Sequence, residues 1–575
     1  MSSPPLKPKF QTVLEALEHG GDAFGRDPVI TFIHDDGTAT PWKASAIRAA
    51  AMRFAHHLQA DGVQANTTLP IVLPTSPELV IAFFGALYAG AWPSLLGVPS
   101  GFGDIENFGR RIGATATHLQ ARHMVTTVAL REAAMSSIVG EIGFIDGGAC
   151  AGRDQGSDAE SLISPTRSAA SGADLAIIQC TSGSTGLPKG VMLSHANLLA
   201  NVEQISIGLG VRPGDVVVSW LPLHHDMGLI GCLLFALYAG IDLVLFSPAK
   251  FLRRPATWLR TISDYRASFS PAPNFAYSYV ASRTREVDLA GLDLSCWRAA
   301  LCGAEPIDPR TLVRFQERFA PLGLRENVML PCYGLAEASL AATFHRSGTP
   351  TDCDLIDRDA LNGSGEVRPV REGSAVIATE IVSCGSPLPG TRVRIVDADG
   401  KDVGEQRAGW IEVSGPSIMM GYFDAAEKTA EVLHDGWLGT GDLGYLREGR
   451  VYVTGRGKDV IIIRGKNYAP TDFEWAAEEV PGVRKGGVVA FGVFDPAQGT
   501  ETLHLVCETG EHGTAREQLT EAVHAHVAAR CGIRPEVVRL CRRYAIPRTT
   551  SGKLQRAKTK EAYLDMQASR EWRTL

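Results

Sequence analysis

The chain has 575 residues, of which 45% are hydrophobic and 21% are charged, and its formal net charge is −7. These fractions are typical of a globular protein with several domains and a large core, and they exclude a disordered or fibrous chain. The small acidic excess gives no basic surface for nucleic acid. Glycine, with 60 residues, is above its usual share and predicts many tight turns.

Nothing in the sequence indicates export or a membrane span. Residues 1–10 lack the apolar run of a secretory signal. The most apolar stretch, residues 229–246, contains Asp242 and two glycines, so it predicts a buried helix followed by a buried strand. The 11 cysteines form no CxxC pair and no zinc-type spacing, as is typical of reduced cysteines. We therefore expect a cytoplasmic protein.

Short apolar runs alternate with helical patterns between residues 28 and 389. This alternation is typical of α/β architecture with largely parallel sheets. Strands are predicted at 176–180, 216–221, 243–246, 299–302 and 328–332, and a helix at 310–319.

The pattern changes after residue 390. Strands at 393–396, 410–413 and 451–454 predict a smaller β-rich unit. The last hundred residues predict a compact α+β unit, with strands at 460–463, 487–491 and 503–507 and helices at 473–479 and 515–529. A charged, glycine-rich turn at 455–459 lies between the two and is suited to act as a hinge.

The sharpest local signal is the sequence TSGSTGLPKG at residues 181–190. Three glycines and four hydroxyl side chains offer exposed backbone N–H groups and hydroxyl donors, and Lys189 adds a positive charge. This chemistry suits a loop that folds around phosphate oxygens. Pro188 and Gly190 stand where a Walker A loop has glycine and serine or threonine. The alternative is an ordinary surface turn.

Seven motifs in order resemble those of the adenylate-forming superfamily, which includes acyl-CoA synthetases, non-ribosomal peptide adenylation domains and luciferases. Together they span nearly the whole chain. They are TSGSTGLPKG at 181–190, WLPLHHDMG at 220–228, GAEP at 303–306, YGLAE at 333–337, TGDLG at 440–444, GRGKD at 455–459 and PRTTSGK at 547–553.

Within this superfamily the chain is most similar to fatty acyl-AMP ligases. The segments APNFAY at 272–277 and VSCG at 382–385 are similar to segments of that group. The stretch around 344–381 is also longer than an acyl-CoA synthetase requires. In acyl-AMP ligases an insertion here restricts the domain rotation that reaction with CoA needs. The alternative is a tolerated surface loop.

The resemblance implies an overall architecture. Residues 1–457 would form a large N-terminal domain of two α/β sheet lobes plus a small β-rich subdomain. Residues 458–575 would form a smaller, mobile α+β C-terminal domain that carries a catalytic lysine loop. Lys458 would lie at the hinge between them.

The resemblance also implies a nucleotide site built from five of these motifs. Tyr333 would stack on adenine, and Asp442 would accept hydrogen bonds from the ribose hydroxyls. Taken alone, these residues are also explained by core packing and by a turn. The residues implied to bind ATP and AMP are Thr181, Ser182, Gly183, Ser184, Thr185, Gly186, Lys189, Gly303, Ala304, Glu305, Tyr333, Gly334, Asp442 and Arg456.

Three residues are implied to be catalytic. Glu337, with Thr181, would hold Mg²⁺ on the phosphate oxygens. Lys553 would bridge the substrate carboxylate and the α-phosphate. His225 would lie near that carboxylate. Without the resemblance, a helix-capping glutamate, a surface lysine and a hydrogen-bonded histidine explain them equally well.

The expected function is a fatty acyl-AMP ligase that uses ATP and Mg²⁺. It would activate a medium- or long-chain fatty acid and pass the acyl group to the phosphopantetheine thiol of a separate acyl carrier protein. An acyl pocket is predicted from Met227, Gly228, Asn274, Phe275 and Tyr277. The alternatives are an acyl-CoA synthetase and a non-catalytic nucleotide- or lipid-binding scaffold. We expect a monomer with no nucleic-acid partner.

Overall fold

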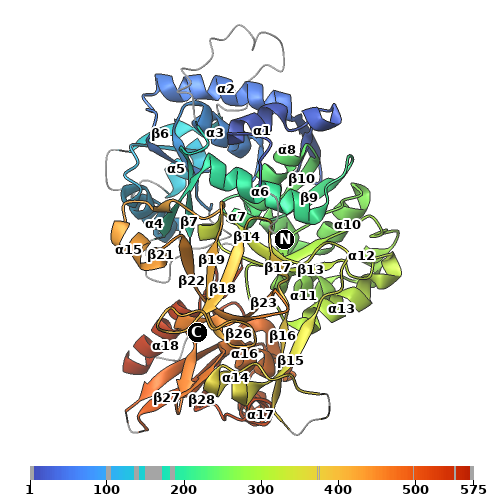
Figure 1. Cartoon of the computed structure of the whole chain (residues 1–575), viewed down its shortest axis with the longest axis vertical. Helices are drawn as coiled ribbons and strands as arrows, with labels where there is room; N and C mark the ends of the chain where they lie inside the picture. The colour runs from blue at the N-terminus through green and yellow to red at the C-terminus, as the bar shows by residue number, and fades with distance from the viewer. Residues whose placement is uncertain are drawn as a thin grey trace.

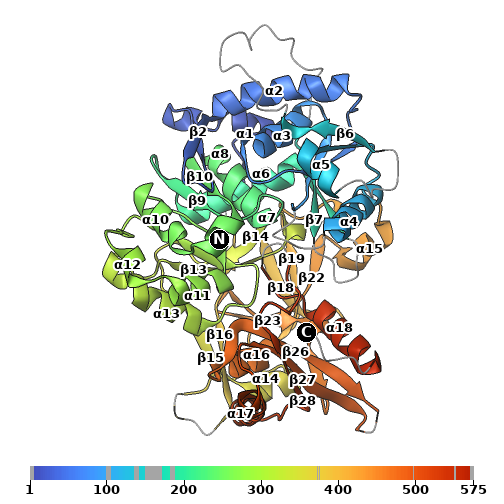
Figure 2. The same cartoon turned by 180° about the vertical axis from the view of Figure 1, so that it is seen from behind.

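The computed structural model of the chain describes residues 6–98, 105–134, 142–148, 171–181, 188–371, 373, 376–496, 498–549 and 552–569. Figures 1 and 2 show an elongated molecule in which the last elements of the chain, coloured orange to red, form the lower part. The fold is mixed α/β, with a large N-terminal part and a smaller C-terminal part, as the sequence predicted.

Two four-stranded sheets carry the upper lobe. One is parallel throughout, with the order β4 (Trp92–Leu95), β3 (Thr68–Val72), β5 (His123–Thr126) and β6 (Gly143–Asp146). The other has the order β2 (Ala39–Lys43), β1 (Val29–Ile33), β10 (Asp242–Phe246) and β9 (Val216–Ser219), and β2 is its antiparallel edge. The helices of this lobe are α1 (Val13–His19), α2 (Ala44–Ala60), α3 (Pro77–Tyr88), α4 (Ile105–His118), α5 (Val128–Ala134), α6 (His195–Leu209), α8 (Phe235–Ala239), α9 (Pro248–Arg253) and α10 (Ala256–Asp264).

The predicted phosphate loop begins at the end of β7 (Leu175–Thr181) and reaches β8 (Lys189–Ser194). These strands are antiparallel, and β20 (Gly421–Tyr422) pairs with β8 from a distant part of the chain. Helix α6 starts only after β8, and its first turn is closed by its own cap, since the Ser194 side chain accepts a hydrogen bond from the Asn197 backbone N–H. Lys189, the first residue of β8, supplies a positive charge at the end of this loop.

A mixed sheet of five strands lies in the middle of the molecule. Its order is β11 (Ala272–Pro273), β12 (Ala300–Gly303), β13 (Met329–Gly334), β14 (Ala341–Phe344) and β17 (Ser386–Pro387). Its helices are α11 (Asn274–Arg283), α12 (Glu286–Leu289) and α13 (Pro309–Phe319). Helix α13 forms because Asp308 caps it, Pro309 opens it, and Leu312, Phe315 and Phe319 recur on one buried face.

The long stretch between β14 and β17 folds into a hairpin with a helix. It contains β15 (Cys353–Asp357), α14 (Arg358–Ser364) and β16 (Ala378–Val382), and the two strands pair antiparallel. In both views the yellow helix α14 lies among the orange and red elements of the C-terminal part (Figures 1 and 2). The stretch is thus a structured element between the two parts of the molecule.

A small antiparallel β unit connects the middle sheet to the C-terminal part, as predicted. Its strands are β18 (Arg392–Val396), β19 (Gly409–Ser414), β21 (Leu433–His434), β22 (Trp437–Arg447) and β23 (Arg450–Arg456), with α15 (Ala426–Val432) beside them.

The C-terminal part has a hydrophobic core of its own. The buried residues of that core lie between Ile461 and Leu540, whereas the largest core of the molecule uses residues from Val13 to Leu438. Its elements are β24 (Ile461–Ile463), β25 (Lys466–Tyr468), α16 (Pro470–Glu479), β26 (Val483–Asp495), β27 (Thr500–Thr509), α17 (Thr514–Cys531), β28 (Val537–Arg542) and α18 (Arg556–Ser569).

The apolar stretch at 229–246 is a helical segment followed by β10, as predicted. In the part of the chain that the structure describes, no helix combines the length and apolar character required to cross a bilayer.

Candidate active site

A cavity of about 450 Å³ lies where the upper lobe, the middle sheet and the C-terminal part meet. One group of its lining residues is polar or charged: Thr181, Lys189, His225, Asp226, Glu337, Arg456, Lys458 and Lys553. The other group is apolar: Ile205, Leu209, Val217, Met227, Phe235, Phe269, Leu301, Leu340 and Phe344. A cavity of this composition suits a ligand with a charged head and an alkyl tail.

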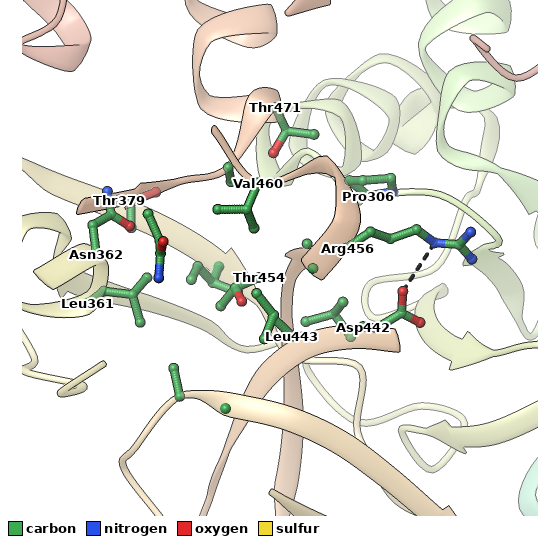
Figure 3. Close-up of a pocket in the computed structure, with 18 of the residues that line it drawn as sticks. Pro306, Leu361, Asn362, Thr379, Asp442, Leu443, Thr454, Arg456, Val460 and Thr471 are labelled. Carbon is green, nitrogen blue, oxygen red and sulfur yellow. Dashed lines mark ion pairs between the residues drawn. The ribbon is translucent and has the colours of Figure 1, made fainter. Parts of the chain in front are cut away.

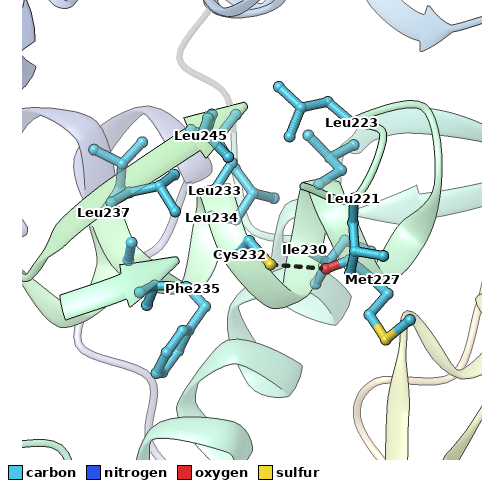
Figure 4. Packing of buried hydrophobic residues seen from close by; sticks show 14 of the residues in the cluster. Leu221, Leu223, Met227, Ile230, Cys232, Leu233, Leu234, Phe235, Leu237 and Leu245 are labelled. Carbon is cyan, nitrogen blue, oxygen red and sulfur yellow. Dashed lines mark hydrogen bonds between the residues drawn. The ribbon is translucent and has the colours of Figure 1, made fainter. Parts of the chain in front are cut away.

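The segment from Asp226 to Ala239 supplies one apolar wall of the cavity. It comprises α7 (Asp226–Gly228), a π-helix (Leu229–Leu234) and α8, and it is buried almost throughout. Met227, Gly231 and Phe235 recur at intervals of four and line the cavity. Figure 4 shows that other residues of the same segment, Ile230, Leu233 and Leu237, pack into the core.

Tyr422 contacts both Glu337 and Lys189, which line one side of the cavity. The Tyr422 hydroxyl donates a hydrogen bond of 2.8 Å to Glu337 Oε1, and Lys189 Nζ lies 3.3 Å from that hydroxyl. The Lys189 ammonium also lies over the Tyr422 ring, 4.4 Å from its centroid. One side chain thus orients both the carboxylate and the lysine that the motifs assigned to Mg²⁺ and phosphate.

We expect Tyr422→Phe to reduce activity about tenfold, because loss of a hydrogen bond to a metal-binding carboxylate typically costs 10–100-fold in metal affinity or activity. The Mg²⁺ concentration that gives half-maximal pyrophosphate release should rise, with little change in Tm. The matched control is Tyr265→Phe, because Tyr265 is a half-buried tyrosine that lines neither this cavity nor the larger cavity described next. An unchanged Mg²⁺ dependence would remove Tyr422 from this role.

A second cavity of about 600 Å³ adjoins the first and shares Ala304, Cys332, Tyr333, Gly334 and Arg456 with it. In this cavity the Tyr333 hydroxyl donates a hydrogen bond of 2.8 Å to Asp442 Oδ2. Arg456 Nε lies 3.1 Å from Asp442 Oδ1. Figure 3 marks this ion pair with a dashed line. Asp442 is 5% exposed, and burial raises the pKa of its carboxyl while Arg456 opposes the rise. A carboxylate has further lone pairs, so Asp442 can still accept a ribose hydroxyl.

The predicted adenine wall is built from the end of β12 and the residues after it. Gly303 packs tightly against β13, because a Cβ there would lie 2.7 Å from Cys332 Sγ. Ala304 adopts a left-handed backbone with φ of 67° and borders both cavities. Glu305 lines the second cavity and accepts a hydrogen bond of 2.6 Å from the Phe275 N–H. Gly334 lies close to the next strand, since a Cβ would approach Leu340 O to 1.8 Å.

Lys553 reaches the cavity from a turn of the C-terminal part. Its N–H donates to Thr549 Oγ1 at 3.1 Å, and its carbonyl accepts from the Thr549 N–H at 2.8 Å. The turn is anchored by Arg548, which donates to Gly486 O and Gly552 O. Burial lowers the pKa of Lys553, and the negative charges of Asp226 and Glu305 oppose this shift.

Two adjacent residues face the Lys553 side of the cavity. Burial lowers the pKa of the His225 imidazole well below its ordinary value, and the nearby His224 and Lys553 add to the effect. His225 is therefore neutral at pH 7. Burial raises the pKa of Asp226, while Lys553 lowers it. Asp226, which the motifs did not single out, thus lies close enough to Lys553 for each to affect the pKa of the other.

The structure places several predicted residues away from the cavity wall. Gly228 packs against backbone, since a Cβ would lie 2.3 Å from Pro222 O. Tyr277 is fully buried, and its hydroxyl donates to Leu301 O at 2.7 Å. Phe275 packs against Trp220 and Gly552, and Asn274 opens α11. Of the five residues predicted for the acyl pocket, Met227 alone lines either of the two cavities. Ser182, Gly183, Ser184, Thr185 and Gly186 lie outside the described residues.

Comparisons with known proteins show the family to which the chain belongs. The family model of AMP-binding enzymes matches residues 22–423. The chain is 36% identical to a Caulobacter vibrioides protein provisionally named as an acyl-CoA synthetase, with 90% of the chain and 89% of the relative covered. It is 33% identical to the long-chain-fatty-acid–AMP ligase FadD26 of Mycobacterium marinum, with 96% and 97% covered. It is 31% identical to the medium-chain-fatty-acid–[acyl-carrier-protein] ligase JamA of Moorena producens, with 97% and 96% covered.

The solved structures give the same result. A structure from studies of fatty acyl-adenylate ligases of E. coli and L. pneumophila matches with a TM-score of 0.89 and 33% identity. The match covers 98% of this chain and 100% of that chain. The chain therefore belongs to the family of AMP-binding enzymes, in the group of fatty acyl-AMP ligases.

Proposed function

We propose that this enzyme converts a medium- or long-chain fatty acid and ATP into acyl-adenylate and pyrophosphate, and then transfers the acyl group to the thiol of a separate acyl carrier protein. The observation that carries the proposal is the cavity of about 450 Å³ lined by Lys553, which we call the main cavity. Its apolar wall suits an alkyl tail, and its charged residues include Lys189, Glu337 and Lys553. The proposal also includes a monomeric, cytoplasmic enzyme with a domain boundary at residues 457–458.

The first step joins two anions, so the protein must neutralise charge and align the reactants. A carboxylate oxygen of the fatty acid bonds to the α-phosphorus of ATP, and the bond to the β-bridging oxygen breaks. We propose that Lys553 holds the carboxylate against the α-phosphate and that Lys189 holds the departing phosphates. Neutral His225 adds no positive charge and can orient the carboxylate by a hydrogen bond. Tyr333, Asp442 and Arg456 would hold the nucleoside.

Glu337 fits a Mg²⁺ site. It is a carboxylate on the cavity wall that accepts a hydrogen bond from Tyr422 and lies near Lys189. Mg²⁺ commonly uses one or two carboxylates together with phosphate oxygens and water. No cluster of three His, Cys, Asp or Glu side chains competes for a metal within the described ranges. Bound there with help from Thr181, Mg²⁺ would act as a Lewis acid on the phosphates.

In the second step the thiol sulfur bonds to the acyl carbonyl carbon, the thiol proton is lost, and the bond from that carbon to AMP breaks. The name of JamA supports a carrier protein as the acceptor, and so does the structured insertion, which is tied to the C-terminal part. Arg358, at the start of α14, donates a hydrogen bond of 3.1 Å to Arg530 O, and its Nε lies 3.8 Å from Asp472 Oδ2. We propose that these contacts hold back the domain rotation that CoA would require.

The test is a comparison of products from purified enzyme, ATP, Mg²⁺ and fatty acid, with CoA or a phosphopantetheinylated carrier protein added. Acyl-AMP should accumulate when CoA is added, and the acylated carrier protein, with release of AMP, should form when the carrier protein is added. Rapid acyl-CoA formation would identify an acyl-CoA synthetase instead. Absence of pyrophosphate release with every acid would favour a binding scaffold.

We expect Arg358→Ala to allow acyl-CoA formation, because it breaks an almost buried contact of the insertion with Asp472 and with the backbone of α17. Acyl-AMP formation should change little, since Arg358 lines neither large cavity. Asp359→Ala is the matched control, because its pair with Lys466 is exposed and screened by solvent and therefore contributes little. Acyl-CoA yields as low as those of the unaltered enzyme would argue against this restraint, provided that the variant keeps its fold.

A further inference from the structure

The ring of Phe344 separates two hollows in the protein. On one side is the main cavity, and on the other is an outer pocket of about 470 Å³. Phe344 is 4% exposed and, among the described residues that line the two hollows, it alone borders both. The outer pocket also contains Arg346 and Pro350, which are exposed, so it opens at the surface. One aromatic side chain thus stands between the cavity and the solvent.

A glycine in α6 accommodates this ring. A Cβ on Gly208 would lie 2.4 Å from Phe344 Cε2 and 2.5 Å from Cζ, so only a residue without a side chain leaves room for the ring in this place. Gly208 lines the outer pocket, whereas its neighbour Leu209 lines the main cavity. The separation between the two hollows is therefore made where Phe344 meets α6.

The cavity around this ring is apolar. Ile205 and Leu209 of α6 line it, together with Val217 and Phe269, and the charged residues come from other elements. An acyl chain with its carboxylate near Lys553 places its terminal methyl among such side chains. The depth available to that methyl group depends on the residue that closes the apolar side.

We propose that Phe344 limits the length of the acyl chain by closing the main cavity against the outer pocket. The inference rests on the proposed function, because it assumes a fatty acid in this cavity. Without the ring, the two hollows would join, and the tail of a longer acid could extend past α6 into the outer pocket.

The test is a profile of pyrophosphate release with saturated acids from octanoate to eicosanoate, for the unaltered enzyme and for Phe344→Ala. The variant should prefer longer acids. Its kcat/KM ratio for octadecanoate over dodecanoate should rise about tenfold or more, since a methylene that fits or fails to fit a pocket changes discrimination by 10–200-fold. Phe344→Leu should shift the profile less in the same direction, and it keeps more of the packing if the alanine variant folds poorly.

A second pair of variants moves the limit the other way. Phe344→Trp fills the main cavity further. In Gly208→Ala the new Cβ lies beside the outer pocket and pushes the Phe344 ring toward the main cavity. Both variants should therefore favour shorter acids. Phe319→Ala, which removes a fully buried ring that lines neither hollow, should leave the profile unchanged. A profile maximum that stays in place in Phe344→Ala and Phe344→Leu would overturn the inference.

The same samples distinguish this inference from the proposed function. The rise in Tm that each acid causes reports binding without chemistry and yields its own length profile. If the unaltered enzyme binds acids but releases no pyrophosphate, the proposed function fails, while the Tm profiles still test Phe344. If it releases pyrophosphate and the profiles do not shift, only the role of Phe344 fails.

Discussion

Lys553→Ala is expected to slow acyl-adenylate formation about 10²–10³-fold, the effect typical of removing one preorganised group that stabilises developing charge. Lys553 lines the cavity that also contains Glu337 and Lys189, although it comes from the C-terminal part. The measurement is fatty-acid-dependent ATP–pyrophosphate exchange. Lys558→Ala, which removes an exposed lysine of α18, is the matched control and should retain full activity. Equal rates for both variants would show that Lys553 has no part in the reaction.

The pH dependence gives a separate test of the same lysine. Burial lowers the pKa of Lys553, and the cationic form needed for charge neutralisation is lost as pH rises through that pKa. The exchange rate should therefore fall on the alkaline side at a pH below the ordinary lysine pKa. Lys553→Arg should keep its charge and move that fall to higher pH, with a lower maximum rate, because a guanidinium stays protonated but has a different shape.

Glu337→Gln is expected to reduce the rate of adenylation about 10²–10³-fold, because the Lewis-acid contribution of a bound metal is several kcal/mol. The substitution keeps the size of the side chain and removes the negative charge. The half-saturating Mg²⁺ concentration in a pyrophosphate-release assay should rise sharply, and high Mg²⁺ should restore part of the rate.

The matched control for this variant is Glu326→Gln, because Glu326 is an exposed glutamate that lines neither large cavity. It should leave both the rate and the Mg²⁺ dependence unchanged. A Glu337→Gln enzyme with the Mg²⁺ dependence of the unaltered protein would place the metal on other residues.

Much of the fold was predictable, because strands and helices follow from local patterns. The helix predicted at 310–319 is α13, and the strands predicted at 176–180 and 243–246 are β7 and β10. The sheet order was not predictable in the same way. The pairing of β20 with β8 joins residues more than 200 positions apart, and no local pattern encodes that partner.

The nucleotide motifs are a favourable case for sequence analysis. Lys189, Glu337, Tyr333, Arg456 and Lys553 border one cavity, although more than 360 residues separate the first from the last. Phosphate, ribose and carboxylate require a few particular side chains next to glycine turns. Those requirements leave local signatures in the chain.

The acyl pocket depended on tertiary structure. Met227 and Tyr277 are both buried and both were predicted to line the pocket, yet Met227 borders the cavity and Tyr277 lies in the core. A hydrophobic pattern shows only that a side chain avoids water, and a cavity wall and a packed core satisfy it equally. The sequence by itself determined the family and predicted most of the charged residues that border the cavity, although not Asp226. Only the packing of distant elements decided which apolar residues surround the cavity, that Tyr422 donates a hydrogen bond to Glu337, and that the ring of Phe344 packs against Gly208.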